Sequence, residues 1–178
     1  MKNKKNIQKP ILSAMFLAIG LVLPFLTGQI PEIGNLLCPM HIPAILCGYI
    51  CGGPWGLLVG FITPILRSFI FGMPVLFPRA IAMAFELAAY GFFSGFLYNK
   101  LPKKNASIYI SLLISMVLGR LVWGVVQFLC AGLDIQKFNL SLFWAGAVIE
   151  AIPGIILQIV LIPVLVIALE KHKVKNKN

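Results

Sequence analysis

Ionisable side chains lie inside the apolar stretches of this chain, where a charge is unfavourable unless it has a partner or a task. Four of them are placed well within such stretches: Arg67, Glu86, Arg120 and Glu150. Arg79 stands at the start of one stretch, and His41 stands at the start of another. Charged groups inside membrane-spanning segments usually face the protein interior, a cavity or an opposite charge. These six residues are therefore the first candidates for binding chemistry.

Two helical stripes add neighbours to these charges, at spacings of three and four residues. The first is Arg79, Met83, Glu86 and Tyr90, and the second is Arg120, Trp123 and Gln127. Glu150 is flanked by Gly146 and Gly154, which leave space beside it. Counted from the helix ends, the charges fall between the outer surface and the middle of the membrane. An outward-facing cavity with charges of both signs and aromatic surface suits a small, polar, partly apolar organic molecule. We expect its substrate-binding residues to be Arg79, Glu86, Arg120, Trp123, Gln127, Glu150, His41 and Arg67.

A structural interpretation of the same charges stays open. Glu86 with Arg120, and Glu150 with Arg67, would then be ion pairs that hold helices together. His41 would cap a helix or pack a loop. If the residues do bind a ligand, the excess of Arg over Glu favours an anionic group, because a guanidinium pairs well with carboxylate or phosphate.

Motifs for catalysis are absent from the sequence. There is no Gly-x-x-x-x-Gly-Lys-Ser/Thr loop for ATP hydrolysis, no Gly-x-Ser-x-Gly and no His-Glu-x-x-His. The four cysteines have no metal-ligand spacing with either histidine. We therefore expect a protein that is not an enzyme, with no catalytic residue, no metal and no cofactor.

The elements that must hold these side chains are membrane helices. Of the 178 residues, 60% are hydrophobic and 11% are charged, far more apolar than a soluble core requires. A crossing needs roughly 20 residues, so the chain has room for about six. We expect an all-α integral membrane protein with one domain over residues 1–178. Its six helices are predicted at about 10–26, 36–52, 55–71, 79–98, 107–130 and 142–169.

The basic residues orient these helices. Eleven of the 15 Lys and Arg lie in the N-terminal segment, in the connection around 100–104 and in the C-terminal segment. Positive charge favours the cytoplasmic side, so both termini are predicted to be cytoplasmic in a multi-pass protein of the cell membrane. The basic segments account for most of the net charge of +10. We expect them to contact anionic lipid and expect no nucleic-acid binding.

The stretch Cys38–Pro64 holds no Asp, Glu, Lys or Arg and is predicted to form an entry loop, a helix, a turn at Gly52-Gly53-Pro54 and a second helix. Small residues four apart let helix backbones approach closely in lipid. Such pairs are Ala14 with Ala18, Gly48 with Gly52, Gly56 with Gly60, and Gly91 with Gly95.

Taken together, the chain resembles the substrate-binding S components of energy-coupling factor (ECF) vitamin transporters. The resemblance covers nearly the whole chain. It rests on the six segments, on Leu12-Ser13-Ala14-Met15-Phe16-Leu17-Ala18-Ile19-Gly20, and on Met40-His41-Ile42-Pro43-Ala44-Ile45-Leu46-Cys47-Gly48 followed by Gly56-Leu57-Leu58-Val59-Gly60-Phe61.

The resemblance implies a subunit of an ABC-type importer that binds one vitamin or precursor on the outer side. Its partners would be a transmembrane coupling subunit, which contacts Ala14 and Ala18, and two ATPase subunits. Within the family the chain looks closest to the pantothenate-type branch, so pantothenate or another small anionic vitamin is the expected ligand. Two other functions stay open. One is an autonomous proton-coupled carrier that uses Glu86 or Glu150, and the other is a structural membrane protein.

Overall fold

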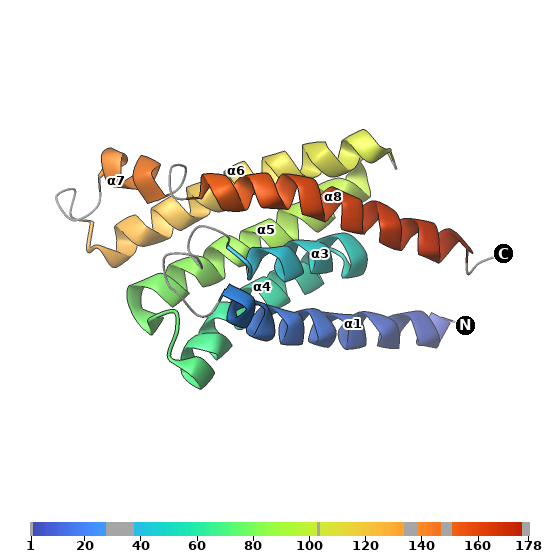
Figure 1. Cartoon of the computed structure of the whole chain (residues 1–178), viewed down its shortest axis with the longest axis horizontal. Helices are drawn as coiled ribbons and strands as arrows, with labels where there is room; N and C mark the ends of the chain where they lie inside the picture. The colour runs from blue at the N-terminus through green and yellow to red at the C-terminus, as the bar shows by residue number, and fades with distance from the viewer. Residues whose placement is uncertain (1, 28–37, 103, 134–138, 147–150, 176–178) are drawn as a thin grey trace.

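A computed structural model describes residues 2–27, 38–102, 104–133, 139–146 and 151–175. The described part is helical, and none of its residues lies in a β-strand. The elements, labelled as in Figure 1, are α1 (Lys2–Val22), the 3₁₀ segment η1 (Leu23–Thr27), α3 (His41–Cys51), α4 (Gly53–Phe71), the short π-type segment η2 (Leu76–Ala80), α5 (Ile81–Lys100), α6 (Asn105–Cys130), α7 (Leu140–Trp144) and α8 (Ile152–Lys175).

Five helical segments in the described part are long and apolar enough to cross a membrane. They are Ile7–Phe25, Gly53–Phe71, Leu76–Lys100, Asn105–Cys130 and Ile152–Leu169. Helix α3 is apolar too, but its 11 residues extend only roughly 16 Å at about 1.5 Å per residue, half of a hydrocarbon core of about 30 Å. The all-helical integral membrane bundle is thus confirmed, while a count of six crossings stays a prediction.

The predicted helix bounds agree with the structure to within two residues for α4, α5 and α6. The structure differs at the first, second and last predicted helices. Helix α1 begins at Lys2, eight residues before the predicted start, and it ends at Val22, where the 3₁₀ segment η1 follows. Helix α3 begins only at His41, and residues 36 and 37 lie outside the described residues. Two helices are found where the helix 142–169 was expected: α7 ends at Trp144, and α8 begins at Ile152. Pro153 is then the second residue of α8. A residue in the first turn has no intrahelical acceptor for its N–H, so proline loses no hydrogen bond there.

Both chain termini and one helix connection lie at the same end of the bundle. Figure 1 shows the beginning of α1, the end of α8 and the connection between α5 and α6 at the same end of the molecule. These are the segments that carry the clustered lysines of the sequence. Their common location supports two termini on one side of the membrane, and the cytoplasmic assignment of that side remains a prediction.

Glycine backbones form the contact between α3, α4 and α5. A Cβ on Gly48 or on Gly56 would strike the carbonyl oxygen of Gly91, and one on Gly95 would strike that of Gly48. A Cβ on Gly60 would strike the carbonyl of Leu87. The close approach predicted from small-residue spacing is confirmed at these glycines. Gly52 has another task, because its φ of 103° ends α3 and turns the chain into α4.

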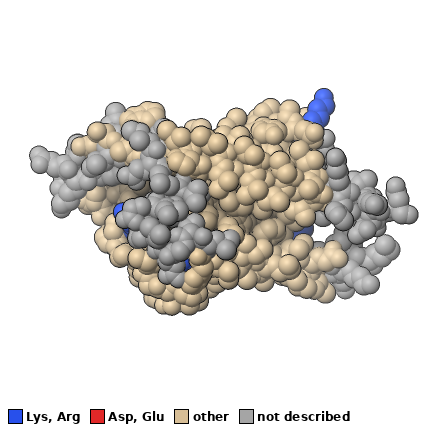
Figure 2. All heavy atoms as spheres, viewed as in Figure 1, with Lys and Arg blue, Asp and Glu red and all other residues tan. Residues whose placement is uncertain are grey.

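The outer surface of the bundle is apolar. Among the described atoms, the face seen in Figure 2 is almost entirely free of charged side chains between the two ends. Exposed side chains such as Leu58, Val117 and Val160 cover the helices. A belt of this kind is what lipid tails require, and it agrees with a multi-pass membrane protein.

Candidate functional site

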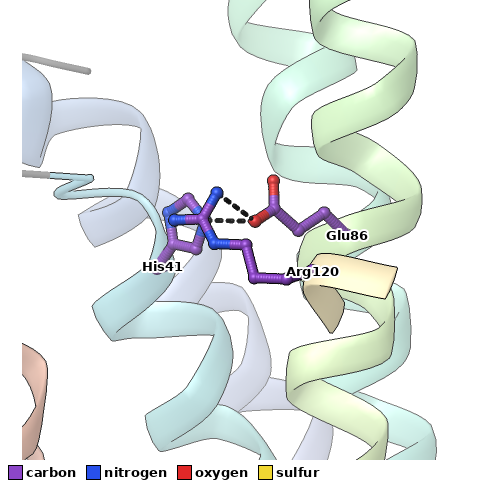
Figure 3. A network of polar contacts seen from close by, with 3 residues as sticks. All are labelled: His41, Glu86 and Arg120. Carbon is purple, nitrogen blue, oxygen red and sulfur yellow. Dashed lines mark ion pairs between the residues drawn. The ribbon is translucent and has the colours of Figure 1, made fainter. Parts of the chain in front are cut away.

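Three charged or ionisable side chains from three helices meet inside the bundle, and we call them the buried ion cluster: His41, Glu86 and Arg120. Figure 3 shows the imidazole and the guanidinium converging on one carboxylate oxygen. Arg120 Nη1 lies 2.9 Å from Glu86 Oε1, and His41 Nε2 lies 3.4 Å from the same atom. His41 and Glu86 are each 2% exposed, and Arg120 is 15% exposed. The cluster is therefore a desolvated ion pair with a histidine beside it.

The short length of α3 sets the depth of the cluster. The turn at Gly52 lies toward the end of the bundle that carries the termini. His41 is 11 residues before that turn, at the opposite end of α3, so it lies roughly 16 Å from the turn along the bundle. Non-helical backbone at this depth, such as Cys38–Met40 before α3, is tolerated only when protein or a cavity surrounds it. The sequence thus brings a helix N-terminus and its polar side chain to the middle of the bundle.

Two further side chains join the cluster, and neither was among the expected site residues. The Tyr90 side chain, one turn after Glu86 on α5, lies close enough to interact with the carboxylate. The Tyr90 ring centroid lies 5.2 Å from that of His41. Cys38, just before α3, interacts with the Arg120 side chain. The helical stripe of Glu86 and Tyr90 was a usable signal for the tyrosine, whereas no spacing in the sequence points to Cys38.

Some hydrogen-bonding capacity of the cluster remains unused. Within the described part of the chain, His41 Nδ1 and Arg120 Nε are buried and have no hydrogen-bond partner. Buried polar atoms are nearly always paired in folded proteins, so these two atoms call for a partner beyond the described side chains. The formal charges of Glu86 and Arg120 cancel, and the N–H at Arg120 Nε is a donor. The cluster therefore offers donors to an incoming acceptor without carrying a net charge.

Trp123 and Gln127 follow Arg120 along α6 toward the end of the bundle away from the termini. The Trp123 ring packs at 6.2 Å from that of Phe143 on α7. A Cβ on Gly146 would come within 2.8 Å of the Trp123 ring. Gln127 is half-buried. Trp123 and Gln127 thus lie about one and two turns beyond Arg120 on α6, and a shared ligand-binding surface there stays a prediction.

Arg67 has a different environment from the one expected. It is 3% exposed and donates a hydrogen bond of 2.5 Å from Nη1 to the carbonyl oxygen of Leu21. Its guanidinium also lies 5.0 Å from the Phe25 ring centroid and 5.2 Å from that of Phe71. A cation at the carbonyl end of α1 stabilises the helix end. The side chain thus fastens α1 to α4.

The remaining expected residues contribute little to the cluster. Arg79 is exposed in η2, and no ion pair links it to another described residue. Glu150, including the proposed pair with Arg67, lies outside the described residues. The pair between Glu86 and Arg120 is confirmed, so only one of the three arginines is placed at the described part of the site, and it already faces a carboxylate.

Ala14 and Ala18 lie on the exposed side of α1. Ile11, Met15 and Ile19 share that side and are 55%, 55% and 43% exposed. The opposite side, with Ser13, packs on α3, where Cys47 Sγ donates a 3.6 Å hydrogen bond to Ser13 Oγ. Because their side chains are small, the two alanines form a shallow depression between larger side chains on the exposed surface of α1.

Metal binding has no support in the described part of the chain, where no group of three or more His, Cys, Asp or Glu side chains converges. The side chains of the buried ion cluster are suited to contacts by hydrogen bonds and charge in a low-dielectric interior.

The fold and the cluster define a multi-pass membrane protein with a buried group of ionisable side chains. A family model for the ECF transporter, substrate-specific component, matches residues 8–166. The chain belongs to that family, and it is a transport protein of the cell membrane rather than an enzyme. No curated protein and no solved structure matches it significantly.

Proposed function

We propose that this chain captures a vitamin or vitamin precursor from the outer side of the membrane and holds it at the buried ion cluster. The observation that carries the proposal is a pair of buried polar atoms beside one carboxylate, His41 Nδ1 and Arg120 Nε, which have no hydrogen-bond partner among the described residues. The family membership supports a role as the substrate-binding subunit of an ECF importer. Residues that would contact the ligand are His41, Glu86 and Arg120, with Trp123 and Gln127 toward the outside. Glu150 and Arg79 stay in the proposal as ligand contacts from the sequence alone, whereas the described contacts of Arg67 favour a structural role.

Pantothenate or another small anionic vitamin remains the first ligand to test. Arg120 presents five N–H donors, and one of its nitrogens already faces Glu86. A carboxylate of the ligand would share the guanidinium with Glu86 and take a hydrogen bond from His41. Such sharing is weaker than binding to an unpaired arginine, so an uncharged acceptor, for instance a carbonyl, competes well at the same place.

The partners in the proposal are a transmembrane coupling subunit and two ATPase subunits. The exposed Ala14 and Ala18 would receive the coupling subunit, because small residues let a second helix approach closely in lipid. The ATPases would supply the energy that this chain has no motif to supply.

The first experiment is native mass spectrometry of the protein purified in detergent from cells grown in rich medium. A co-purified small molecule of vitamin size is the expected result. Purified protein is then heated with pantothenate, riboflavin, folate and pyridoxine, each at micromolar concentration. A ligand that binds the folded state raises the melting temperature. If no molecule co-purifies and none of the four shifts the melting temperature, binding of these vitamins is contradicted.

Transport without partners would contradict the proposal in another way. Vesicles containing only this chain should not accumulate the vitamin. Uptake in such vesicles that follows a proton gradient would instead identify an autonomous carrier that uses an acidic residue such as Glu86.

A further inference from the structure

A buried amide on α8 has no role in the site described so far. Gln158 is 1% exposed, and its Oε1 has no hydrogen-bond partner in the described part of the chain. It lies in the most apolar of the five membrane-competent segments. An unpaired carbonyl in such surroundings is unfavourable, and it calls for an explanation.

The position of Gln158 is fixed by the apolar residues around it on α8. Ile155 and Ile162, three residues before and four residues after it, lie on the same face of the helix. Both pack into the core cluster that contains Ile42 of α3 and Tyr90 of α5. Gln158 is therefore on the side of α8 that faces the protein, and its amide points away from lipid.

The core around Gln158 reaches the helices of the buried ion cluster. Ile42, which belongs to that core, follows His41 directly, and Tyr90 of the same core lies one turn after Glu86. Helix α8 contacts α3 and α6 and passes the beginning of α3 in Figure 1. Helix α8, with Gln158 on its inward face, thus packs on the two helices that carry His41 and Arg120.

We propose that Gln158 is a further ligand-binding residue, whose Oε1 accepts a hydrogen bond from a hydroxyl or N–H group of the ligand. This inference rests on the proposed function. It adds a second recognition point to the site, since the buried ion cluster offers donors and Gln158 offers an acceptor. The ligand is then a small molecule with an acceptor group toward Arg120 and an uncharged donor toward α8. Its middle portion is expected to be apolar, because Ile155 beside Gln158 and Ile42 beside His41 belong to one apolar core.

The test uses two substitutions of Gln158 that remove the amide. Gln158→Met keeps the length of the side chain, and Gln158→Leu fits the apolar surroundings. The matched control is Leu157→Met on the neighbouring lipid-facing position, which is 37% exposed. The protein is the full chain in detergent, and the probes are pantothenate, riboflavin, folate and pyridoxine.

The first readout is the melting temperature without ligand. If the amide forms its hydrogen bond only with the ligand, it does not stabilise the ligand-free protein. Both Gln158 variants should then melt at the wild-type temperature or above it. If both melt several degrees lower while Leu157→Met does not, the amide has a structural partner and the inference is overturned.

The second readout is the affinity for whichever probe binds the wild-type protein. Loss of a hydrogen bond to a buried group should weaken that affinity about tenfold or more in both variants, with no change in Leu157→Met. Unchanged affinity in the Gln158 variants overturns the inference and leaves the proposed function intact. Failure of all four probes with the wild-type protein counts against the proposed function, and the melting temperatures then decide about Gln158 alone.

Discussion

Glu86 is a carboxylate whose charge is balanced inside the protein rather than by water. It is 2% exposed, and Arg120 Nη1 lies 2.9 Å away. Removing one member of a buried pair leaves the other charge uncompensated, at a typical loss of about 3–5 kcal/mol in the free energy of unfolding. Removing both leaves no charge behind. The same two residues are proposed to contact the ligand, and the two roles are separable by experiment.

We expect Glu86→Gln and Arg120→Met each to lower the melting temperature strongly and the double variant to recover most of the loss. The recovery follows from the coupling of the two charges, which a double-mutant cycle measures. Ligand affinity should remain low in the double variant, because the donors of Arg120 are gone. Arg79→Met is the control, and its exposed side chain should leave stability unchanged. A double variant that binds the ligand like wild type would reduce the pair to a purely structural role.

Arg67 is predicted to stabilise the fold without taking part in recognition. Arg67→Met loses the charged hydrogen bond to the Leu21 carbonyl and should lower the free energy of unfolding by about 1.5–3 kcal/mol. Arg67→Lys keeps the charge and should recover part of it. Both variants are melted without ligand and then titrated with it. A large loss of affinity in well-folded Arg67→Lys would restore Arg67 to the binding site.

At the scale of single residues, the sequence predicted which side chains are unusual better than it predicted their partners. The depth of Glu86 and Arg120 in apolar segments was enough to propose their pair. The partner of Arg67 is a backbone carbonyl 46 positions away, and every residue type has such a carbonyl. Gln158 was missed because a single amide carries no formal charge and therefore gives little signal in an apolar stretch.

At the scale of helices, direct backbone contacts at glycines hold α3, α4 and α5 together. Gly91→Ala would place a methyl group against the backbone carbonyl of Gly56, and the two helices would have to separate. We expect a loss of about 1–3 kcal/mol in the free energy of unfolding. Gly20→Ala is the matched comparison, because its methyl group would meet the Thr63 side chain instead. Melting both variants tests the argument, and equal stability of Gly91→Ala and wild type would disprove it.

The bounds of the helices show what an apolar pattern can and cannot specify. α4, α5 and α6 begin and end at glycines, prolines or charged connections, so their limits were predictable to within two residues. The run 142–169 is apolar apart from a few residues such as Glu150 and Gln158, and its hydropathy gives no reason to begin a new helix at Ile152. Pro153 was the signal that was overlooked, since proline favours the first turn of a helix.

At the scale of the whole molecule, the sequence established the class of protein, because composition and the placement of lysines depend on the membrane rather than on side-chain contacts. It left the arrangement of the site open, because the cluster joins residues as far apart as His41 and Arg120. The proposed transport function also depends on a helix surface that the chain's own residues leave exposed. Helix α1 is the least buried of the five membrane-competent segments, and Ala14 and Ala18 lie on its uncovered side.

We expect Ala14→Trp to abolish vitamin uptake in cells that contain the coupling and ATPase subunits, while ligand binding by the purified chain stays at the wild-type level. A bulky indole at this position would keep a second helix from approaching, and it lies on the opposite side of α1 from Ser13 and the protein core. Val117→Trp is the matched control, because Val117 is 62% exposed on α6 and should tolerate the same side chain in lipid. Uptake by radiolabelled vitamin and binding by thermal shift are measured on both variants. If Ala14→Trp takes up vitamin normally, the partner docks elsewhere, and if binding falls together with uptake in folded protein, this face of α1 acts on the site rather than on the partner.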